Sequence, residues 1–262
     1  MTNKLFDDRD MVQIENTATR LPVVLCLDTS KSMDDNGGFE ALNKGVKAFY
    51  DTGKNDPARK YGFDVAIVTF GAQGVTPVQD FRPIWNQEEI PQFVFTDKNW
   101  IDGTPMGRGV DMSIKGLEKR IVTYKDNSIS NDRPWLVIIT DGEPAYIYKQ
   151  GTEEYEAEIE AFDQTVSQVI TLQKNKNLNV IAIGVGAEDF RQLAEFVIDK
   201  KVLTTKDFSE FSVIFESMSK SMAEWGTSNK TEANDSPIAR VMEDLTDEGV
   251  NISIQDYGRD ED

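Results

Sequence analysis

Side chains that carry oxygen follow the first apolar run of the sequence at alternate positions. Residues 21 to 27 are apolar throughout, and Asp28, Ser30 and Ser32 come directly after them. Such a run is typical of a strand that helices bury on both faces, and ligands of open α/β sheets bind beyond the carboxyl ends of the strands. Carboxylate and hydroxyl oxygens are hard ligands that suit Mg²⁺, Mn²⁺ or Ca²⁺. The spacing therefore indicates a cation site in the loop after this strand.

Two distant stretches supply donors of the same kind. Thr104 lies in the segment GTPMG, residues 103 to 107, and Asp141 follows a second apolar run, residues 135 to 139. A plainer interpretation stays open for both groups, because Ser and Asp are common turn residues that also cap helices. Pro105 at the first position of a helix would make Thr104 its N-cap. A capping hydroxyl can still offer a lone pair to a metal, so we expect both roles for Thr104.

The five residues together, in the order Asp28-x-Ser30-x-Ser32, Thr104 and Asp141, resemble the metal-ion-dependent adhesion site of von Willebrand factor A domains. The resemblance is complete in all five positions and covers roughly residues 20 to 225. More narrowly, the surrounding sequence is similar to bacterial tellurium-resistance-associated proteins of this fold. The stretches that carry the narrower similarity are LPVV (21–24), GTPMG (103–107), RPWL (133–136) and DGEP (141–144).

This resemblance implies a binding module without catalytic residues. The hydroxyls of Ser30, Ser32 and Thr104 would contact Mg²⁺, or Mn²⁺ or Ca²⁺, directly or through water. Asp28 and Asp141 would hold coordinated waters and orient the hydroxyls. Three neutral oxygens leave the charge of the ion poorly neutralised, so an Asp or Glu of a protein partner can complete the coordination. The narrower similarity implies Ser/Thr kinase-like and phosphatase-like partners in a bacterial or phage stress-response or defence complex.

Two other functions compete with this hypothesis. A magnesium-dependent phosphotransferase of the haloacid-dehalogenase type would also place an aspartate after the first strand, and Asp28 would be its nucleophile. That chemistry needs a second aspartate two positions on, where this chain has Ser30. It also needs a suitably placed lysine, and none is obvious, although Lys31 and Lys149 stay open. A structural protein with a vestigial site is the third possibility.

Composition narrows the classes of function further. The 262 residues include 28 Lys and Arg against 46 Asp and Glu, a formal net charge of −18, which opposes binding to nucleic acid or to an anionic membrane. The chain has no histidine and one cysteine, Cys26, so His-based triads, zinc sites and an internal disulfide are excluded. We expect Cys26 to be a core residue. Without an apolar leader or membrane span, we expect a cytoplasmic protein.

Apolar runs alternate with amphipathic stretches along the chain. This pattern predicts an α/β fold with a doubly wound, mostly parallel central sheet and helices on both faces. The short connection between the second and third runs predicts one antiparallel edge strand. The expected strands are 21–27, 63–70, 75–81, 135–141, 179–185 and 201–204, and the expected helices are 39–50, 104–124, 153–174, 190–198 and 207–225.

The chain is expected to divide into three parts. Residues 1–19 are an N-terminal extension, residues 20–225 form the von Willebrand factor A domain, and residues 226–262 are an acidic C-terminal tail. Within the tail, residues 237–245 could form an amphipathic helix and residues 250–254 alternate as a strand does. We expect this tail to fold loosely on the domain, with docking to a partner as the alternative.

Overall fold

The structure is a computed structural model of the 262-residue chain. It describes residues 18–35, 37–56, 62–71, 73–86, 89–94, 103–186, 189–225, 236–247 and 252–258. The expected N-terminal extension up to residue 17 and the linker 226–235 lie outside the described residues.

Seven strands form one mixed sheet in the order β3-β2-β1-β4-β5-β6-β7. The five central strands are parallel, and β3 and β7 pair antiparallel at the two edges. The predicted mostly parallel α/β sheet is confirmed, with a second antiparallel edge strand that the analysis of the sequence did not assign to the sheet. The strands are β1 (Leu21–Thr29), β2 (Phe63–Gly71), β3 (Gly74–Pro83), β4 (Trp135–Thr140), β5 (Asn179–Val185), β6 (Lys201–Thr205) and β7 (Ile252–Asp256).

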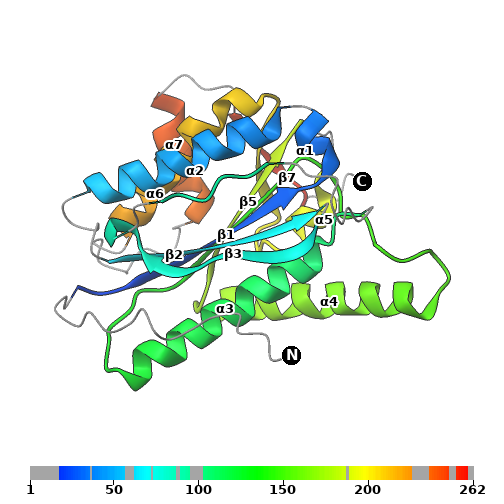
Figure 1. The fold of residues 1–262 in the computed structure, drawn as a ribbon, viewed down its shortest axis with the longest axis horizontal. Coiled ribbons are helices and arrows are strands. Elements are labelled where there is room, and N and C mark those ends of the chain that lie inside the picture. Colours follow the sequence, from blue (N-terminus) through cyan, green and yellow to red (C-terminus); the bar gives the residue numbers. More distant parts are fainter. Residues whose placement is uncertain are drawn as a thin grey trace.

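Helices cover both faces of this sheet, with α2, α6 and α7 on one face and α3 and α4 on the other (Figure 1). Short 3₁₀ turns at Ile84–Asn86 and Phe208–Glu210 accompany them. The helices are α1 (Lys31–Asp35), α2 (Gly38–Asn55), α3 (Met106–Asp126), α4 (Glu153–Lys174), α5 (Arg191–Ala194), α6 (Phe211–Trp225) and α7 (Pro237–Asp247).

The two faces of the sheet carry separate hydrophobic cores. Along β1, Leu25 and Leu27 pack toward α2 and α6, whereas Val24 and Cys26 pack toward α3 and α4. This alternation is that of a strand buried on both faces, as the apolar run indicated. Cys26 is fully buried, as expected, and burial raises the pKa of its thiol to about 12.

Two helix predictions need correction. Helix α3 begins at Met106, and its N-cap is Pro105 rather than Thr104. The backbone of Thr104 instead forms an antiparallel bridge with Ala145, so this residue stays extended and outside the helix. The expected helix 190–198 is a helix only from Arg191 to Ala194, and turns follow it.

The C-terminal residues that the structure describes are packed rather than loosely folded, which corrects that expectation. Helix α7 buries Ile238, Val241 and Leu245 in the core that it shares with α2 and α6. Strand β7 extends the sheet through its pairing with β6. The division of the chain into the ranges 1–19, 20–225 and 226–262 stays a prediction.

Among the described helices, none combines the length and the apolar character needed to cross a lipid bilayer.

Candidate metal centre

Parallel pairing of β1 and β4 brings the carboxyl ends of both strands together. Leu27 pairs with Ile139, so Asp28 and Thr140 follow side by side. The Asp28 carboxylate is fully buried, and the Thr140 hydroxyl donates to its Oδ2 at 2.6 Å. Its Oδ1 accepts from the backbone N–H of Ser30 at 2.7 Å. Both oxygens of Asp28 are therefore held by neighbouring groups of the chain.

A chain of hydroxyls leads from this buried carboxylate to the surface. The Oγ atoms of Ser30 and Ser32 are 2.9 Å apart, and the hydroxyl of Ser32 donates to Oδ1 of Asp141 at 2.8 Å. Ser30 is buried, Asp141 is half-buried and Ser32 is exposed. The structure thus brings four of the five predicted residues into one hydrogen-bonded group at the carboxyl edge of the sheet.

Thr104, the fifth residue, belongs to the neighbouring loop and is not joined to this group by a hydrogen bond. Its backbone N–H donates to the carbonyl of Ala145 at 2.7 Å, which holds the loop before α3 against the loop after β4. Gly103 precedes it with φ 153°, and a Cβ there would lie 3.0 Å from the Ala145 carbonyl oxygen. Within the described residues the Thr104 hydroxyl makes no hydrogen bond. It therefore does not cap α3 and keeps its lone pairs for another ligand.

Both carboxylates of the group are destabilised as anions. Burial and, to a lesser extent, the nearby charge of Asp141 raise the pKa of Asp28 to about 7, against the opposing effect of the hydrogen bonds from Thr140 and Ser30. Burial also raises the pKa of Asp141, against the hydrogen bond from Ser32. A cation bound beside these two carboxylates would favour their ionised forms and offset the cost of burying them.

The donor set fits a hard divalent cation. All five side chains end in oxygen, two of them are carboxylates, and three are neutral hydroxyls. No group of three or more carboxylate, thiolate or imidazole side chains gathers among the described residues. An ion held here would therefore depend on hydroxyl and water oxygens as well as on Asp28 and Asp141, which suits Mg²⁺ better than a soft metal.

The sequence analysis missed Thr140, which is fully buried and makes the shortest hydrogen bond to Asp28. A signal for it was present, because Thr140 ends the apolar run and immediately precedes Asp141. Sequence alone did not show that its hydroxyl lies beside a residue 112 positions earlier, since only the register between β1 and β4 sets that contact.

The same geometry disfavours the phosphotransferase hypothesis. A nucleophilic aspartate must present a free oxygen to its substrate, whereas Asp28 is fully buried and both of its oxygens accept hydrogen bonds. Lys31 is exposed and pairs with Asp35 at 3.1 Å, one turn further along α1.

Comparison with known proteins agrees with this fold. The family model of the von Willebrand factor type A domain matches residues 23–217. The chain therefore belongs to the von Willebrand factor type A domain family. A comparison with curated proteins finds no match.

Solved structures of low identity share the fold. One is the vWF domain of the type V pili tip protein Mfa5 from Porphyromonas gingivalis, which is 10% identical over 83% of this chain and 100% of that one, with a TM-score of 0.51. Another is the pilus adhesin SpaC from Lactobacillus rhamnosus GG in its open conformation, 13% identical over 80% of this chain and 30% of that one, with a TM-score of 0.50.

The comparison also finds the proximal thread matrix protein 1 from the mussel byssus, which is 19% identical with a TM-score of 0.48. The match covers 79% of this chain and 49% of that protein, so this chain spans about half the length of the mussel protein.

Proposed function

We propose that this domain is a metal-dependent protein-binding module that engages an acidic side chain of its partner through a divalent cation. Asp28, Ser30, Ser32, Thr104 and Asp141 would hold the ion, with Mg²⁺ as the expected ion and Mn²⁺ or Ca²⁺ as alternatives. The observation that carries the proposal is the hydrogen-bonded group in which Ser32 links the β1 loop to Asp141 after β4.

The solvent exposure of each side chain indicates its role in the proposed site. Asp28 is fully buried and is hydrogen-bonded to Thr140 at the end of β4 and to Ser30, so its role is to hold Ser30 and to supply negative charge from inside the fold. Ser32 is exposed and Asp141 half-buried, so these residues border the surface that a partner can reach. A bound ion would supply positive charge at that surface, to which a carboxylate from outside can bind.

The family supports an interaction module rather than an enzyme, because von Willebrand factor type A domains are typically non-catalytic modules for protein interaction or adhesion. The narrower resemblance of the sequence supports a more specific role. We propose a bacterial or phage stress-response or defence complex in the cytoplasm, related to tellurium resistance, with kinase-like and phosphatase-like partners.

Affinity capture from the native cell tests the metal-dependent function. The tagged domain is used in Mg²⁺, in EDTA, and as a Ser30→Ala/Ser32→Ala double variant that melts like the parent. We expect a partner that is retained only by the parent in Mg²⁺. Ser167→Ala is the matched control, because it removes an exposed hydroxyl from α4, and it should retain the partner. A partner retained equally in all conditions would show that the site is vestigial.

A further inference from the structure

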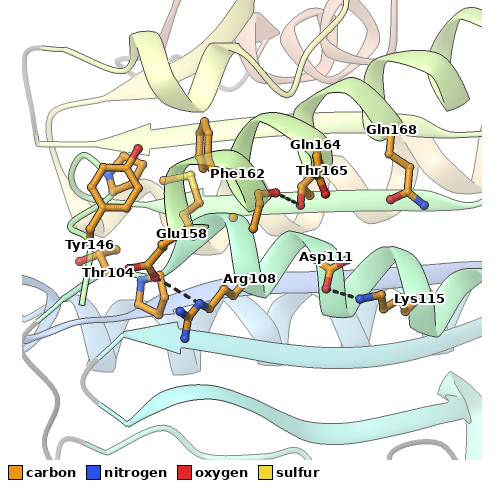
Figure 2. Close-up of a pocket in the computed structure, with 15 residues that line it drawn as sticks. Thr104, Arg108, Asp111, Lys115, Tyr146, Glu158, Phe162, Gln164, Thr165 and Gln168 are labelled. Atoms are coloured by element: carbon orange, nitrogen blue, oxygen red, sulfur yellow. Dashed lines mark hydrogen bonds and ion pairs between the residues drawn. The ribbon is translucent and has the colours of Figure 1, made fainter. Parts of the chain in front are cut away.

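A groove lies between α3 and α4, and Thr104, the fifth residue of the proposed metal site, is among the residues that line it. Its volume is about 220 Å³, and Thr104 and Tyr146 lie at one end of it (Figure 2). From there the groove runs between the two helices toward Lys115 and Gln168. Thr104 therefore belongs both to the proposed metal site and to this groove, which we call the α3–α4 groove.

The groove has a rigid apolar floor. Met106 and Phe162 lie beneath it and are 0% and 6% exposed, so the apolar surface that a ligand can reach comes from the half-buried Pro144 and Tyr146 and from the exposed Ala161. A Cβ on Gly107 would lie 2.7 Å from the ring of Phe162, so α3 and α4 approach each other closely at this point. Because glycine is what permits this approach, the floor is set by helix packing and exists before any ligand arrives.

A fixed guanidinium stands at the side of the groove. Nε of Arg108 lies 3.2 Å from Oε1 of Glu158, whose side chain is only 5% exposed, and Figure 2 shows these two side chains turned toward each other. The other oxygen of Glu158 accepts from the backbone N–H of Ile147 at 3.1 Å. The guanidinium also lies over the ring of Tyr148, 5.4 Å from its centroid. Within the described residues its terminal amines make no hydrogen bond, so they can serve a ligand.

Charge and size restrict what the groove can take. Its charged side chains form two pairs, Arg108 with Glu158 and Lys115 with Asp111 at 2.6 Å, so it offers no net charge to a second charged group. Drug-sized ligands occupy pockets of roughly 300–1,000 Å³. The volume of about 220 Å³ suits one large side chain.

We propose that the α3–α4 groove receives an apolar side chain, of the size of Leu, Met or Phe, that neighbours the acidic residue in the partner's sequence. Pro144, Tyr146 and Ala161 pack against it, and the terminal amines of Arg108 donate to a main-chain carbonyl of the same peptide. This inference rests on the proposed function, because Thr104 joins the groove to the metal site. It adds the sequence context by which the module selects its partner.

An array of short synthetic peptides tests the groove without knowledge of the native partner. Each peptide carries one central glutamate, and each flanking position is varied in turn. Binding of the full chain is measured in Mg²⁺ and in EDTA. The parent should bind in Mg²⁺ only, and should prefer Leu, Met or Phe at one position beside the glutamate by about tenfold or more.

Three variants separate the contributions. Ala161→Trp fills the groove from an exposed position of α4 and should abolish the apolar preference while the metal-dependent binding of glutamate persists. Ser167→Trp places the same ring at an exposed position of α4 outside the groove and should behave as the parent. Arg108→Lys keeps a charge beside Glu158 but loses the forked donors, and should weaken all peptides alike by about threefold or more.

The outcomes distinguish the two proposals. If Ala161→Trp keeps the parent's apolar preference, or the parent binds glutamate peptides in Mg²⁺ without any such preference, the groove proposal is wrong and the proposed function stands. If binding is the same in EDTA, or no peptide binds in Mg²⁺, the proposed function fails and the groove proposal fails with it.

Discussion

Asp28 shows at the scale of single residues why a fully buried carboxylate can still serve a surface site. Its two oxygens are bound to the Thr140 hydroxyl and to the backbone of Ser30, so its position and its charge are set from inside the fold. The exposed side of the site is left to Ser32 and Asp141. Thr140 is therefore a positioning residue for the proposed site, since it is fully buried and its hydroxyl donates to Asp28.

Replacement of Thr140 tests this positioning role. Thr140→Val removes the hydroxyl that donates to Asp28 and should lower the affinity for Mg²⁺ by roughly 10–100-fold, as for other groups that orient metal ligands. Thr140→Ser keeps the donor and should bind like the parent. Titration calorimetry with Mg²⁺ measures both variants. An unchanged affinity in a folded Thr140→Val protein would show that Asp28 does not need this hydrogen bond.

Mg²⁺ itself should stabilise the folded domain if the site binds it. At a concentration about 100 times its dissociation constant, a ligand of the folded state adds about 2.7 kcal/mol to the free energy of unfolding, which raises Tm by about 5–10 °C for a chain of this size. The Ser30→Ala/Ser32→Ala double variant should lose most of this shift. Thermal melts in Mg²⁺ and in EDTA measure it, and equal shifts in parent and variant would place the ion elsewhere.

At the scale of elements, a buried charged cluster ties β2 to α3. Oδ2 of Asp64 accepts from Nη2 of Arg120 at 2.8 Å and from the Tyr124 hydroxyl at 2.5 Å. Nη1 of Arg20, just before β1, lies 3.6 Å from its Oδ1. Burial and the charge of Asp64 both raise the pKa of Tyr124, so its hydroxyl stays a donor. Asp64 thus fixes how α3, which carries one wall of the groove, lies on the sheet.

Loss of the Asp64 charge should therefore be costly. Asp64→Asn leaves two arginines beside a neutral amide and should lower the free energy of unfolding by about 3–5 kcal/mol, whereas Tyr124→Phe should cost about 1–2 kcal/mol. Urea denaturation measures both. Lys44→Ala breaks the exposed pair with Glu40 and serves as the control that should not change the midpoint. An Asp64→Asn protein as stable as the control would contradict a structural role for this cluster.

At the scale of the whole molecule, the C-terminal segment completes the fold. Helix α7 packs on α6, and the hydroxyl of Ser221 donates to Asp244 at 2.8 Å between them. Strand β7 pairs with the edge of β6. The match to the family model ends at residue 217, before these elements. We propose that the folded unit extends through residue 258.

Substitution of Leu245 tests whether this segment unfolds together with the domain. Leu245 is 1% exposed, so Leu245→Ala should lower the free energy of unfolding by about 2–5 kcal/mol. Glu243→Ala, at an exposed position two residues earlier in α7, should leave stability unchanged. Urea denaturation followed by circular dichroism measures both, and equal midpoints for the two variants would mean that α7 detaches without loss of the fold.

Local patterns in the sequence were enough to predict most elements, and they singled out four residues that the structure joins by hydrogen bonds, Asp28, Ser30, Ser32 and Asp141. Helix α4 begins and ends where predicted because its signals are local: the Thr152 side chain caps it by accepting from the N–H of Tyr155, and acidic residues occupy its first turn. The apolar runs of β1, β4 and β5 likewise predict buried parallel strands, because only strands covered on both faces are apolar at every position.

Contacts between distant residues were beyond such patterns. Pro105 favoured Thr104 as a helix cap. Thr104 instead stays extended, because its backbone forms a bridge with Ala145, which lies 41 positions further along the chain. The alternation of apolar and polar residues around residue 252 predicts a strand but not the strand with which it pairs. In the structure it pairs with β6, at the edge of the sheet.

The sequence by itself determined the α/β class, the buried strands and the oxygen-bearing loop Asp28-x-Ser30-x-Ser32, since each depends on residues close together in the chain. Only the tertiary structure decided that Thr140 supports Asp28, that Asp141 meets Ser32, and that α3 and α4 leave a groove beside Thr104. The physical reason is that strand register and helix packing set these contacts, and both depend on how the whole core fills.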